Sequence, residues 1–180
     1  MALTVTLVVC GVIAATPTGP ARDLLYPVKY ADVIRAASTR HDIDPHLACA
    51  VIKCESGWDE NAVSSAGAQG LMQVMPETAL SMEALGLVDA RAYDPNDLLD
   101  PEVNIEYGCA CLGYLQDHLS SLDEIIAAYN AGIGTVQGWL EDGATIPEGI
   151  EYAETRTYLE RVQSAYEGYQ RSYPNGITGA

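Results

Sequence analysis

The sequence predicts a single, mainly helical domain. Its 180 residues are enough for one domain with a substantial core. Several segments carry apolar residues at helical spacing, and residues typical of helix starts and stops bound them. The sequence contains no alternating run long enough for a strand, no internal repeat and no interdomain linker. We therefore expect helices packed around one core.

Two helices are expected in the first third of the chain. The pattern of residues 27–41 predicts an amphipathic helix with one broad apolar face. Asp44 followed by proline is a typical helix start, and residues 45–55 are apolar almost all round. A helix of that kind is buried in the middle of a domain. Glu55 lies at its C-terminal end, and Gly57 provides a stop.

The middle of the chain predicts a loop and two further helices. Residues 58–70 are rich in Gly, Ser and Ala and are interpreted as a loop. Pro76 begins a helix that ends near Gly86. After a turn-rich connector, Asp100 and the proline that follows it cap a helix over residues 101–118.

The last third predicts a capped helix, a single helical turn and a long final helix. Ser121 and Glu124 form a capping box before a helix that ends at Gly132. Residues 136–140 are expected to form one short turn. After a Gly/Pro loop, residues 151–170 form a final amphipathic helix.

The charge balance excludes some partners. The chain has 9 Lys and Arg and 25 Asp and Glu, which gives a net charge of −16. Such a chain is not expected to bind nucleic acid or to dock electrostatically on an anionic membrane. It also has 11 Tyr and no Phe. Aromatic rings with a polar tip suit wet grooves such as those that bind sugars, but Tyr can equally replace Phe in an ordinary core.

The N-terminal segment predicts export. Residues 3–15 form a continuous uncharged run of signal-peptide length, too short for a confident membrane span. We expect an export signal or a short membrane anchor over residues 1–22, although no Lys or Arg precedes the apolar run. A buried N-terminal strand is the alternative. Residues 173–180 are expected to form a flexible tail.

Four cysteines follow the apolar run, and an exported chain can form disulfides. Cys49 and Cys54 are five residues apart on one expected helix, and Cys109 and Cys111 point to nearly opposite sides of another. A bridge would therefore have to join the two helices. We predict at most one such disulfide, with four small buried thiols as the alternative.

No metal site or cofactor motif is found in the sequence. His41, His46 and His118 are scattered, and no HExxH motif, EF-hand loop, phosphate-binding loop or GxGxxG motif occurs. Glu55 is the strongest chemical candidate. A carboxyl group at the end of a buried helix loses solvation and faces the negative end of the helix dipole, and both effects raise its pKa. Such a group can act as a general acid, whereas an exposed terminal Glu would be inert.

The loop after Glu55 has the composition of a ligand-contacting surface. Gly67 and Gly70 are interpreted as places where the backbone approaches a ligand closely. Gln73 and the serine hydroxyls can bond to sugar oxygens and amides. Met72 and Met75 are expected to supply apolar contacts.

These motifs together resemble a known family. The pattern ES-G-W-x₅-S-x₂-GA-x-GLMQ-x-MP-x-TA is similar to that of the lytic transglycosylases of the SLT type, which have a lysozyme-like α+β fold. The resemblance continues in Asn104-Ile105-x-x-Gly108, in the AYNAG block ending at Gly132 and in ETR-x-Tyr158. It runs from about residue 27 to residue 170, so residues 25–172 are expected to be the catalytic domain.

The resemblance implies an enzyme that cleaves the β-1,4 bond between N-acetylmuramic acid and N-acetylglucosamine in a peptidoglycan strand. Glu55 takes the position of the catalytic acid, and no metal or cofactor is implied. The substrate-binding residues implied are Ser64, Gln73, Met75, Tyr129, Asn130 and Tyr158, with Tyr129 and Asn130 on the floor of the cleft and Tyr158 facing Glu55. Core packing is the alternative role for both tyrosines.

The resemblance also implies a mechanism with one carboxylate. Glu55 protonates the glycosidic oxygen, and the muramic N-acetyl group assists in place of a second carboxylate. Glu55 then takes the proton of the C6 hydroxyl, which closes on C1 to give a 1,6-anhydro sugar. The attack is intramolecular, so its high effective concentration lets it outrun water. Asp59 and Glu60 are the nearest other carboxylates and are interpreted as solvated loop charges.

Alternatives remain open at this stage. A hydrolytic muramidase of the goose-lysozyme type would add a second carboxylate that positions water, and a catalytically inactive glycan-binding module would need no turnover. The small domain is also compatible with work in a secretion or cell-wall assembly complex, and we expect a monomer. Cys54, Cys109 and Cys111 depart from the family pattern, as does the pI of about 4.2.

Overall fold

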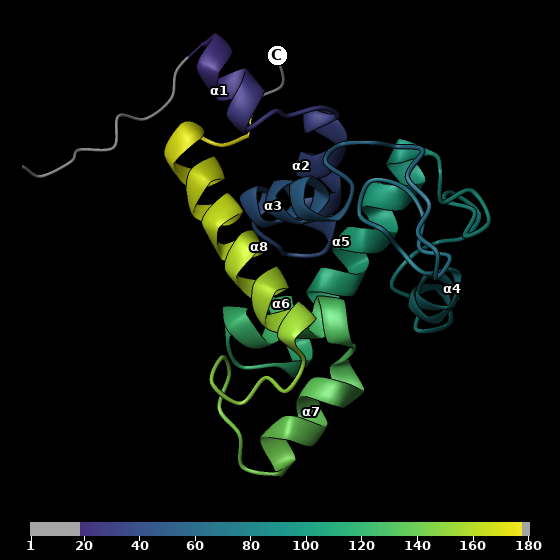
Figure 1. The fold of residues 1–180 in the computed structure, drawn as a ribbon. Helices are drawn as coiled ribbons and strands as arrows, with labels where there is room; N and C mark the ends of the chain where they lie inside the picture. Colours follow the sequence, from purple (N-terminus) through teal and green to yellow (C-terminus); the bar gives the residue numbers. More distant parts are fainter. Residues whose placement is uncertain (1–18, 178–180) are drawn as a thin grey trace, which may run out of the picture.

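The computed structural model describes residues 19–177, and the apolar run of residues 3–15 lies outside this range. Within it the chain folds into helices joined by loops (Figure 1), which confirms the mainly helical fold class. The helices are α1 (Pro20–Leu25), α2 (Ala31–Arg40), α3 (Pro45–Glu55), α4 (Pro76–Ala84), α5 (Pro101–His118), α6 (Leu122–Ala131), α7 (Ile133–Glu141) and α8 (Ala153–Ser172).

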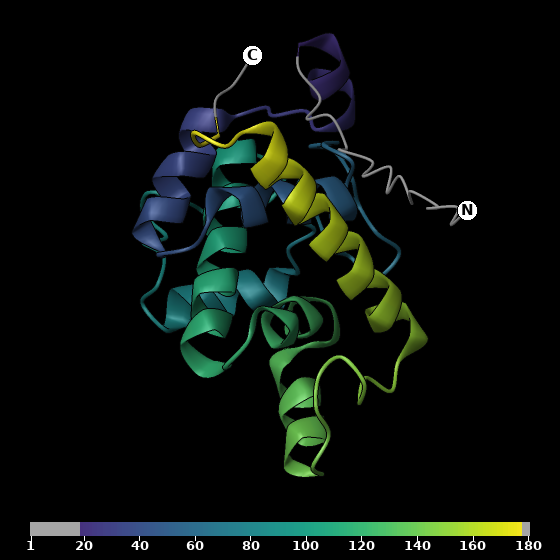
Figure 2. The same cartoon turned by 90° about the vertical axis from the view of Figure 1, so that its left-hand side faces the viewer.

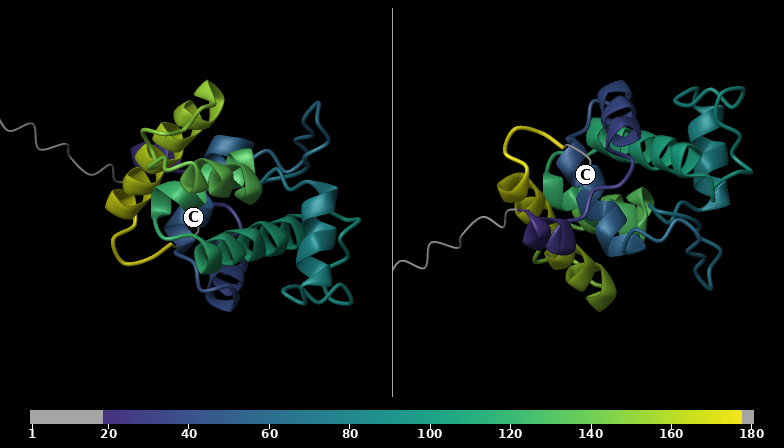
Figure 3. Two further views of the ribbon diagram at one scale, coloured as in Figure 1. Left: turned by 90° about the horizontal axis from the view of Figure 1, so that it is seen from below. Right: turned by 90° about the horizontal axis from the view of Figure 1, so that it is seen from above.

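Helix α3 lies in the middle of the molecule (Figures 1 and 2). Its residues from Leu47 to Ile52 are all buried, as its apolar sequence predicted. It packs against α2 and α8, and α8 also packs against α6. Seen from below and from above, α5 runs from this central group towards α4 (Figure 3). The core therefore fixes the C-terminal end of α3 from several sides.

Three predicted helix starts are confirmed by their caps. The Asp44 side chain accepts a hydrogen bond from the backbone N–H of His46 at 2.8 Å. Asp100 accepts from the N–H of Glu102 at the same distance, and Ser121 accepts from that of Glu124. The reciprocal bond of the capping box goes to Ser120, one residue before the expected donor. These caps satisfy N–H groups that the first helical turn leaves without partners.

Two predicted helices have different bounds in the structure. The helix expected over residues 27–41 begins only at Ala31, because Tyr30 has a left-handed backbone conformation with φ 55° and ψ 34°. The single turn expected over residues 136–140 is the nine-residue helix α7. Its burial of Val136 and Trp139 outweighs the low helix propensity of its glycines.

The packed domain extends past the predicted boundary at residue 172. Tyr173 and Ile177, which lie in the segment expected to be a flexible tail, are 4% and 1% exposed. The carbonyl oxygen of Ile177 accepts a hydrogen bond from Arg35 at 2.9 Å, and the Tyr173 hydroxyl donates to the carbonyl oxygen of Tyr26. The residues up to Ile177 therefore belong to the fold.

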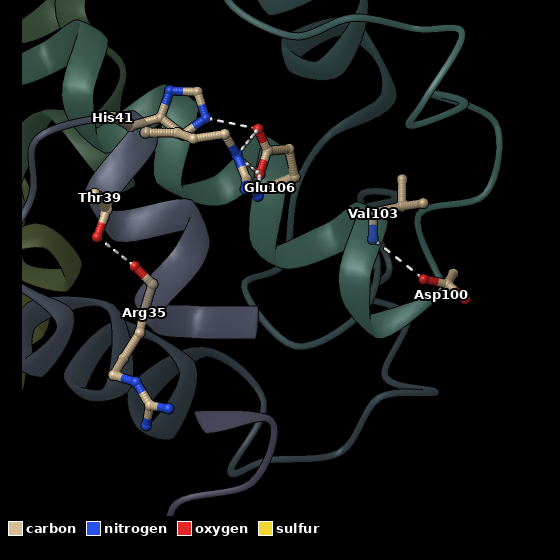
Figure 4. Close-up of polar contacts among 7 residues, drawn as sticks. Arg35, Thr39, His41, Asp100, Val103 and Glu106 are labelled. Carbon is tan, nitrogen blue, oxygen red and sulfur yellow. Dashed lines mark hydrogen bonds and ion pairs between the residues drawn. The ribbon is translucent and has the colours of Figure 1, made fainter. Parts of the chain in front are cut away.

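A buried carboxylate joins α2 to α5 (Figure 4). Glu106 is 3% exposed and accepts hydrogen bonds from the guanidinium of Arg40 and from Nε2 of His41, the latter at 2.9 Å. Burial alone would raise the pKa of Glu106, but the hydrogen bonds and the charges of these two partners outweigh it and lower the pKa. Glu106 is therefore a buried anion that is stabilised by its partners.

The four cysteines of the described region are free thiols. Cys49 on α3 and Cys109 on α5 are fully buried, and Cys54 and Cys111 are partly buried. Burial raises the pKa of both Cys109 and Cys111 to about 12. These groups behave as small apolar side chains, in keeping with the prediction of at most one disulfide.

Strand structure between residues 19 and 177 is limited to two isolated bridges, which pair Gln69 with Val63 and with Val74. They close the loop that follows α3. Over the same residues, no helix combines the length and the apolar character needed to cross a membrane.

Candidate active site

Glu55 is the last residue of α3, and the turn after it is held by a serine. Ser56 donates a hydrogen bond from Oγ to the carbonyl oxygen of Leu71 at 2.8 Å and accepts one from the N–H of Trp58 at 3.1 Å. Gly57 and Trp58 have φ values of 61° and 72°, so the chain reverses sharply here. The predicted stop at Gly57 is confirmed.

Trp58 anchors this turn in the core. The side chain is 3% exposed, and its Nε1 donates to the hydroxyl oxygen of Tyr169 at 3.0 Å. Tyr169 in turn donates to the carbonyl oxygen of Pro27 at 2.8 Å. A residue with positive φ is strained unless its surroundings fix it, and these bonds supply that constraint. The backbone of Glu55 is thus held by α8 and by the segment before α2.

Glu55 opens into a pocket of about 420 Å³, which we call the Glu55 pocket. The pocket is formed by the C-terminal ends of α3 and α6 and the N-terminal half of α8. Its lining residues are Cys54, Glu55, Asn130, Ala153, Glu154, Thr157, Tyr158 and Arg161. Three of the predicted site residues, Glu55, Asn130 and Tyr158, therefore come together from three helices.

The surroundings of Glu55 raise the pKa of its carboxyl group. Burial is the main cause, because it penalises the charged form. The Tyr158 hydroxyl and the positive charge of Arg161 act in the opposite direction without cancelling it. The position at the negative end of α3 favours the protonated form as well. Glu55 is thus suited to hold a proton and to release it next to a polar donor.

Two tyrosines lie around Glu55, of which Tyr158 is buried and Tyr129 is partly buried. The Tyr158 hydroxyl is buried beside Glu55 and has no other hydrogen-bond partner within residues 19–177. The Tyr129 hydroxyl donates to the carbonyl oxygen of Met72 at 2.9 Å. Burial raises the pKa of both groups well above its usual value, and the charge of Glu55 adds to the effect. Both therefore stay neutral, and the Tyr158 O–H remains free to donate to a ligand or to Glu55.

Tyr129 and Asn130 face different pockets. Asn130 lines the Glu55 pocket, where its Oδ1 accepts a hydrogen bond from the buried Thr155 at 2.8 Å. That bond joins the end of α6 to the start of α8. Tyr129 lines a neighbouring pocket of about 390 Å³ between α4, α5 and α6. The cleft floor expected from both residues is therefore divided between two adjacent hollows.

The loop residues Ser64, Gln73 and Met75 lie outside the lining of the Glu55 pocket. Ser64 Oγ accepts from the N–H of Ala68 at 3.0 Å, and Gln73 Nε2 donates to the carbonyl oxygens of Ala62 and Gly70. These bonds shape the loop itself. The side-chain oxygen of Gln73 and the partly exposed side chain of Met75 are left for contact with a ligand.

Two expectations about this loop were wrong. Met72 is fully buried and packs against Gly108 of α5, so it cannot touch a ligand. Gly70 is also buried, and a Cβ atom there would lie 2.5 Å from the carbonyl oxygen of Leu98 and 2.7 Å from Cγ of Asn104. Both residues serve the close packing of the loop on α5.

Asn104 holds the loop in place, a role that the sequence did not reveal. The side chain is fully buried and accepts a hydrogen bond from the N–H of Met72 at 2.7 Å. It donates to the carbonyl oxygens of Gln69 at 2.7 Å and Leu98 at 2.8 Å. One amide thus satisfies three backbone groups of two loops. Its place in the Asn-Ile-x-x-Gly motif was the available signal.

A second carboxylate lies in the Glu55 pocket, but it is not one of those expected. Asp59 accepts from the N–H of Asn61 in its own loop, and Glu60 accepts from the hydroxyl of Tyr30 at the start of α2; neither lines the pocket. Glu154, at the start of α8, lines the pocket together with Glu55. Its sequence signal was its place four residues before Tyr158 in the ETR-x-Tyr block.

Among residues 19–177, no group of three or more His, Cys, Asp or Glu side chains is arranged to hold a metal ion. The pocket itself brings together two carboxyl groups, a tyrosine hydroxyl, an amide and a guanidinium.

Known proteins share this sequence pattern and fold. Residues 32–146 match the model of the transglycosylase SLT domain. The soluble lytic murein transglycosylase of Salmonella typhimurium is 36% identical in an alignment of 157 positions that covers 82% of this chain and 24% of that protein. The membrane-bound lytic murein transglycosylase C of Edwardsiella ictaluri is 34% identical in an alignment of 173 positions that covers 79% of this chain and 47% of that protein.

Solved structures agree with the sequence relatives. The 70 kDa soluble lytic transglycosylase of Escherichia coli superposes with a TM-score of 0.74 at 33% identity, over 81% of this chain and 24% of that one. An inactive glutamate-to-glutamine mutant of the lytic transglycosylase Slt of Pseudomonas aeruginosa gives a TM-score of 0.75 at 28% identity, over 87% of this chain and 26% of that one.

The mainly helical fold with a half-buried glutamate at the end of its central helix is that of a lysozyme-like domain. The chain belongs to the transglycosylase SLT domain family. It spans about a quarter of the length of the soluble relatives that it matches.

Proposed function

We propose that this domain is a peptidoglycan lytic transglycosylase that cleaves the bond between N-acetylmuramic acid and N-acetylglucosamine and leaves 1,6-anhydro ends. The observation that carries the proposal is Glu55, a carboxyl group with a raised pKa at the fixed end of a buried helix, open to a pocket. The names of its relatives, lytic murein transglycosylases, support the same reaction.

Glu55 acts first as the acid. Burial keeps its carboxyl group protonated above the usual range for glutamate, so it can donate a proton to the glycosidic oxygen. As the bond breaks, Glu55 becomes an anion. The Tyr158 hydroxyl and the positive charge of Arg161 both favour that anion, so they stabilise the state in which the proton has left.

Glu55 acts next as the base. The carboxylate takes the proton of the C6 hydroxyl of the muramic residue, and that oxygen closes on C1. The sugar's N-acetyl group assists at C1 in place of a carboxylate. Asn130 and Tyr158 share the pocket with Glu55 and are placed to orient the sugar. Ser64, Gln73, Met75 and Tyr129 extend the binding surface along the strand.

A hydrolytic muramidase is the second candidate, and one observation favours it. Glu154 lines the same pocket as Glu55 and is exposed to solvent, where a carboxylate could position a water molecule. A lytic transglycosylase does not need this second carboxylate in the chemical step.

Mass spectrometry of the products from purified peptidoglycan tests the proposal. Wild type should release anhydro-muramyl products, and Glu55→Gln should lose about 10²–10⁴-fold in rate because positioned acid–base catalysis is worth that much. Glu154→Gln is the matched variant and should keep the anhydro products. Products heavier by one water that disappear in Glu154→Gln would establish the hydrolase instead.

We also propose that the domain works at the cell envelope, where its substrate lies. Relatives carry names of both soluble and membrane-bound enzymes. The predicted export signal or anchor of residues 1–22 would bring the chain there. Its expected monomeric state and its part in a secretion or cell-wall assembly complex stay predictions.

A further inference from the structure

Besides the pocket lined by Tyr129, another pocket adjoins the Glu55 pocket at Cys54 and Arg161. Its volume is about 380 Å³, and it lies between the C-terminal end of α3, the segment before α2 and the middle of α8. Lys53, Arg161, Tyr26, Cys54 and Glu160 are among the residues that line it. We call it the Lys53–Arg161 pocket. Cys54 and Arg161 line both pockets, so these two residues separate the two hollows.

Within residues 19–177, the two cations of this pocket lack acidic partners, as do Lys29 and Arg156, which bind carbonyl oxygens elsewhere. All nine Lys and Arg residues of the chain lie in the described part. Five of them form ion pairs with a carboxylate, namely Arg22, Arg35, Arg40, Arg91 and Arg171. Lys53 and Arg161 form none within residues 19–177, although the chain carries 25 acidic residues.

Neutral groups hold both side chains in place. Arg161 donates to the carbonyl oxygen of Cys54 at 2.9 Å. Lys53 donates to the carbonyl oxygen of Leu25, and its ammonium lies 5.2 Å from the centre of the Tyr26 ring. An ammonium has three N–H donors and a guanidinium has five, so each side chain keeps most of its donors free. The pocket thus presents two oriented positive charges beside the catalytic carboxyl.

We propose that the Lys53–Arg161 pocket binds a carboxylate of the peptide stem that muramic acid carries in peptidoglycan. This inference rests on the proposed function of the Glu55 pocket. A glycan strand that lies at Glu55 presents its neutral sugars to that pocket and its stems to the surroundings. A carboxylate is the anion that the substrate supplies, and charge-assisted hydrogen bonds from Lys and Arg are the strongest that a protein offers to it.

The net charge of −16 makes such a local site necessary. Stem-bearing strands carry carboxylates, so the protein's overall field repels them. Screening limits that field to about 8 Å at physiological ionic strength, and at shorter range the nearest charges decide. Glu160 lines the same pocket and opposes an anion there. Two cations against one exposed carboxylate leave the pocket positive.

Steady-state kinetics on two substrates test the proposal. One is stem-bearing glycan strands, and the other is the same strands after an amidase has removed the stems. Lys53→Gln should raise KM about three- to tenfold on stem-bearing strands, the gain expected of a partly exposed charged contact, and leave the stem-free strands unchanged. Glu160→Gln should lower KM on stem-bearing strands. Arg171→Gln removes one positive charge from α8, the helix that carries Arg161, at a position outside the pocket. It should leave KM unchanged on both substrates.

Arg161→Gln needs a separate readout because Arg161 also lowers the pKa of Glu55. It should move the pH profile on both substrates and raise KM on stem-bearing strands alone. Lys53 is not among the groups that shift the pKa of Glu55, so the Lys53 variant tests stem binding without changing the acid. Equal changes on the two substrates, or no change in the Lys53 variant, would overturn the proposal while the proposed function stands.

Calorimetry without turnover separates the two hypotheses. Glu55→Gln is titrated with a disaccharide–tetrapeptide fragment of peptidoglycan and with the disaccharide alone. The fragment should bind more tightly, and adding Lys53→Gln should reduce the difference about three- to tenfold, because Arg161 remains. If wild type cleaved neither strand, the proposed function would fail, and this titration would still decide whether the pocket binds the stem. Equal affinity for both fragments would refute the pocket's role.

Discussion

The surroundings of Glu55 suit the proposed reaction at the expense of folding. The desolvation that raises its pKa also penalises the folded state whenever the group ionises. A structural carboxylate in the same molecule, Glu106, has a lowered pKa because Arg40 and His41 bond to it. The two glutamates show how partners decide whether burial leaves a carboxyl protonated or charged.

Glu55→Gln should therefore make the protein more stable at neutral pH. A carboxyl group whose folded pKa is raised contributes stability below its unfolded pKa and loses it as the pH rises through the folded pKa. Gln has no such loss, so the variant should unfold at a higher temperature than wild type at pH 7 and at the same temperature near pH 4. Thermal unfolding followed by circular dichroism measures both. A variant that is less stable at pH 7 would contradict the burial argument.

At the residue scale, the sequence predicted the role of a candidate site residue only where its type and position are compatible with a single role. Glu55 was found because an acid at the end of an apolar helix is chemically distinctive. Met72 and Gly70 were misassigned because a small or flexible residue in a loop looks the same whether it faces a ligand or a helix. Only the position of α5, which places Asn104 and Gly108 against the loop, distinguishes the two.

At the scale of elements, helix bounds were predicted well where a cap sets them. The starts of α3, α5 and α6 follow directly from Asp44, Asp100 and Ser121. Helix α2 begins late because Tyr30 takes a left-handed conformation that nothing in the residue type requires. Helix α7 is longer than its glycines predict, since tertiary packing of Val136 and Trp139 overrides local propensity.

The contact between α5 and the loop is tight enough to test with one methyl group. A Cβ atom at Gly108 would lie 2.8 Å from Cβ of Met72. Gly108→Ala should cost about 1–3 kcal/mol, the usual price of overpacking, and lower Tm by roughly 2–4 °C for each kcal/mol. Activity should fall too, because the carbonyl of Met72 binds the Tyr129 hydroxyl.

Gly138→Ala is the matched control for this substitution. Gly138 lies within α7, and no atom outside its helix lies within 4 Å of a Cβ placed there. Alanine at that position should stabilise the helix by about 0.5–1 kcal/mol. Both variants replace Gly by Ala within a helix. If Tm falls for Gly108→Ala and rises for Gly138→Ala, the loss at Gly108 is due to its contact with Met72. Equal signs would mean that helix propensity dominates at both positions.

The link between α2 and α5 depends on the ionised form of Glu106. Its lowered folded pKa means that the stability it contributes is present above the unfolded pKa and is lost as the pH falls through the folded one. Glu106→Gln should cost about 2 kcal/mol at pH 7, since it leaves Arg40 and His41 with a weaker acceptor.

Denaturant unfolding at pH 7, 5 and 3 tests this prediction. The gap in unfolding free energy between wild type and Glu106→Gln should shrink as the pH falls, because acid removes the same charge from wild type. Glu102→Gln, on the exposed side of the same helix, should show no such gap. A gap that stays constant with pH would mean that packing of the side chain, and not its charge, joins the helices.

For the whole molecule, two electrostatic effects oppose each other. The excess negative charges, which give a net charge of −16, repel one another and destabilise the folded state. Five Arg–carboxylate pairs stabilise it locally. Exposed pairs are worth about 0–1 kcal/mol each, and four of the five are exposed enough to fall in that class. The uncompensated negative charges reach further than these contacts, so repulsion should dominate.

Salt should therefore stabilise this protein. Raising NaCl from about 10 to 300 mM cuts the screening length from about 30 Å to under 10 Å and removes the long-range repulsion first. We expect Tm at pH 7 to rise by a few degrees, the equivalent of about 1 kcal/mol for a domain of this size. The same change of salt near the sequence pI of about 4.2 should have little effect, because the net charge is then close to zero. A fall in Tm at pH 7 would mean that the ion pairs outweigh the net charge and that the acidic surface is better compensated than its composition indicates.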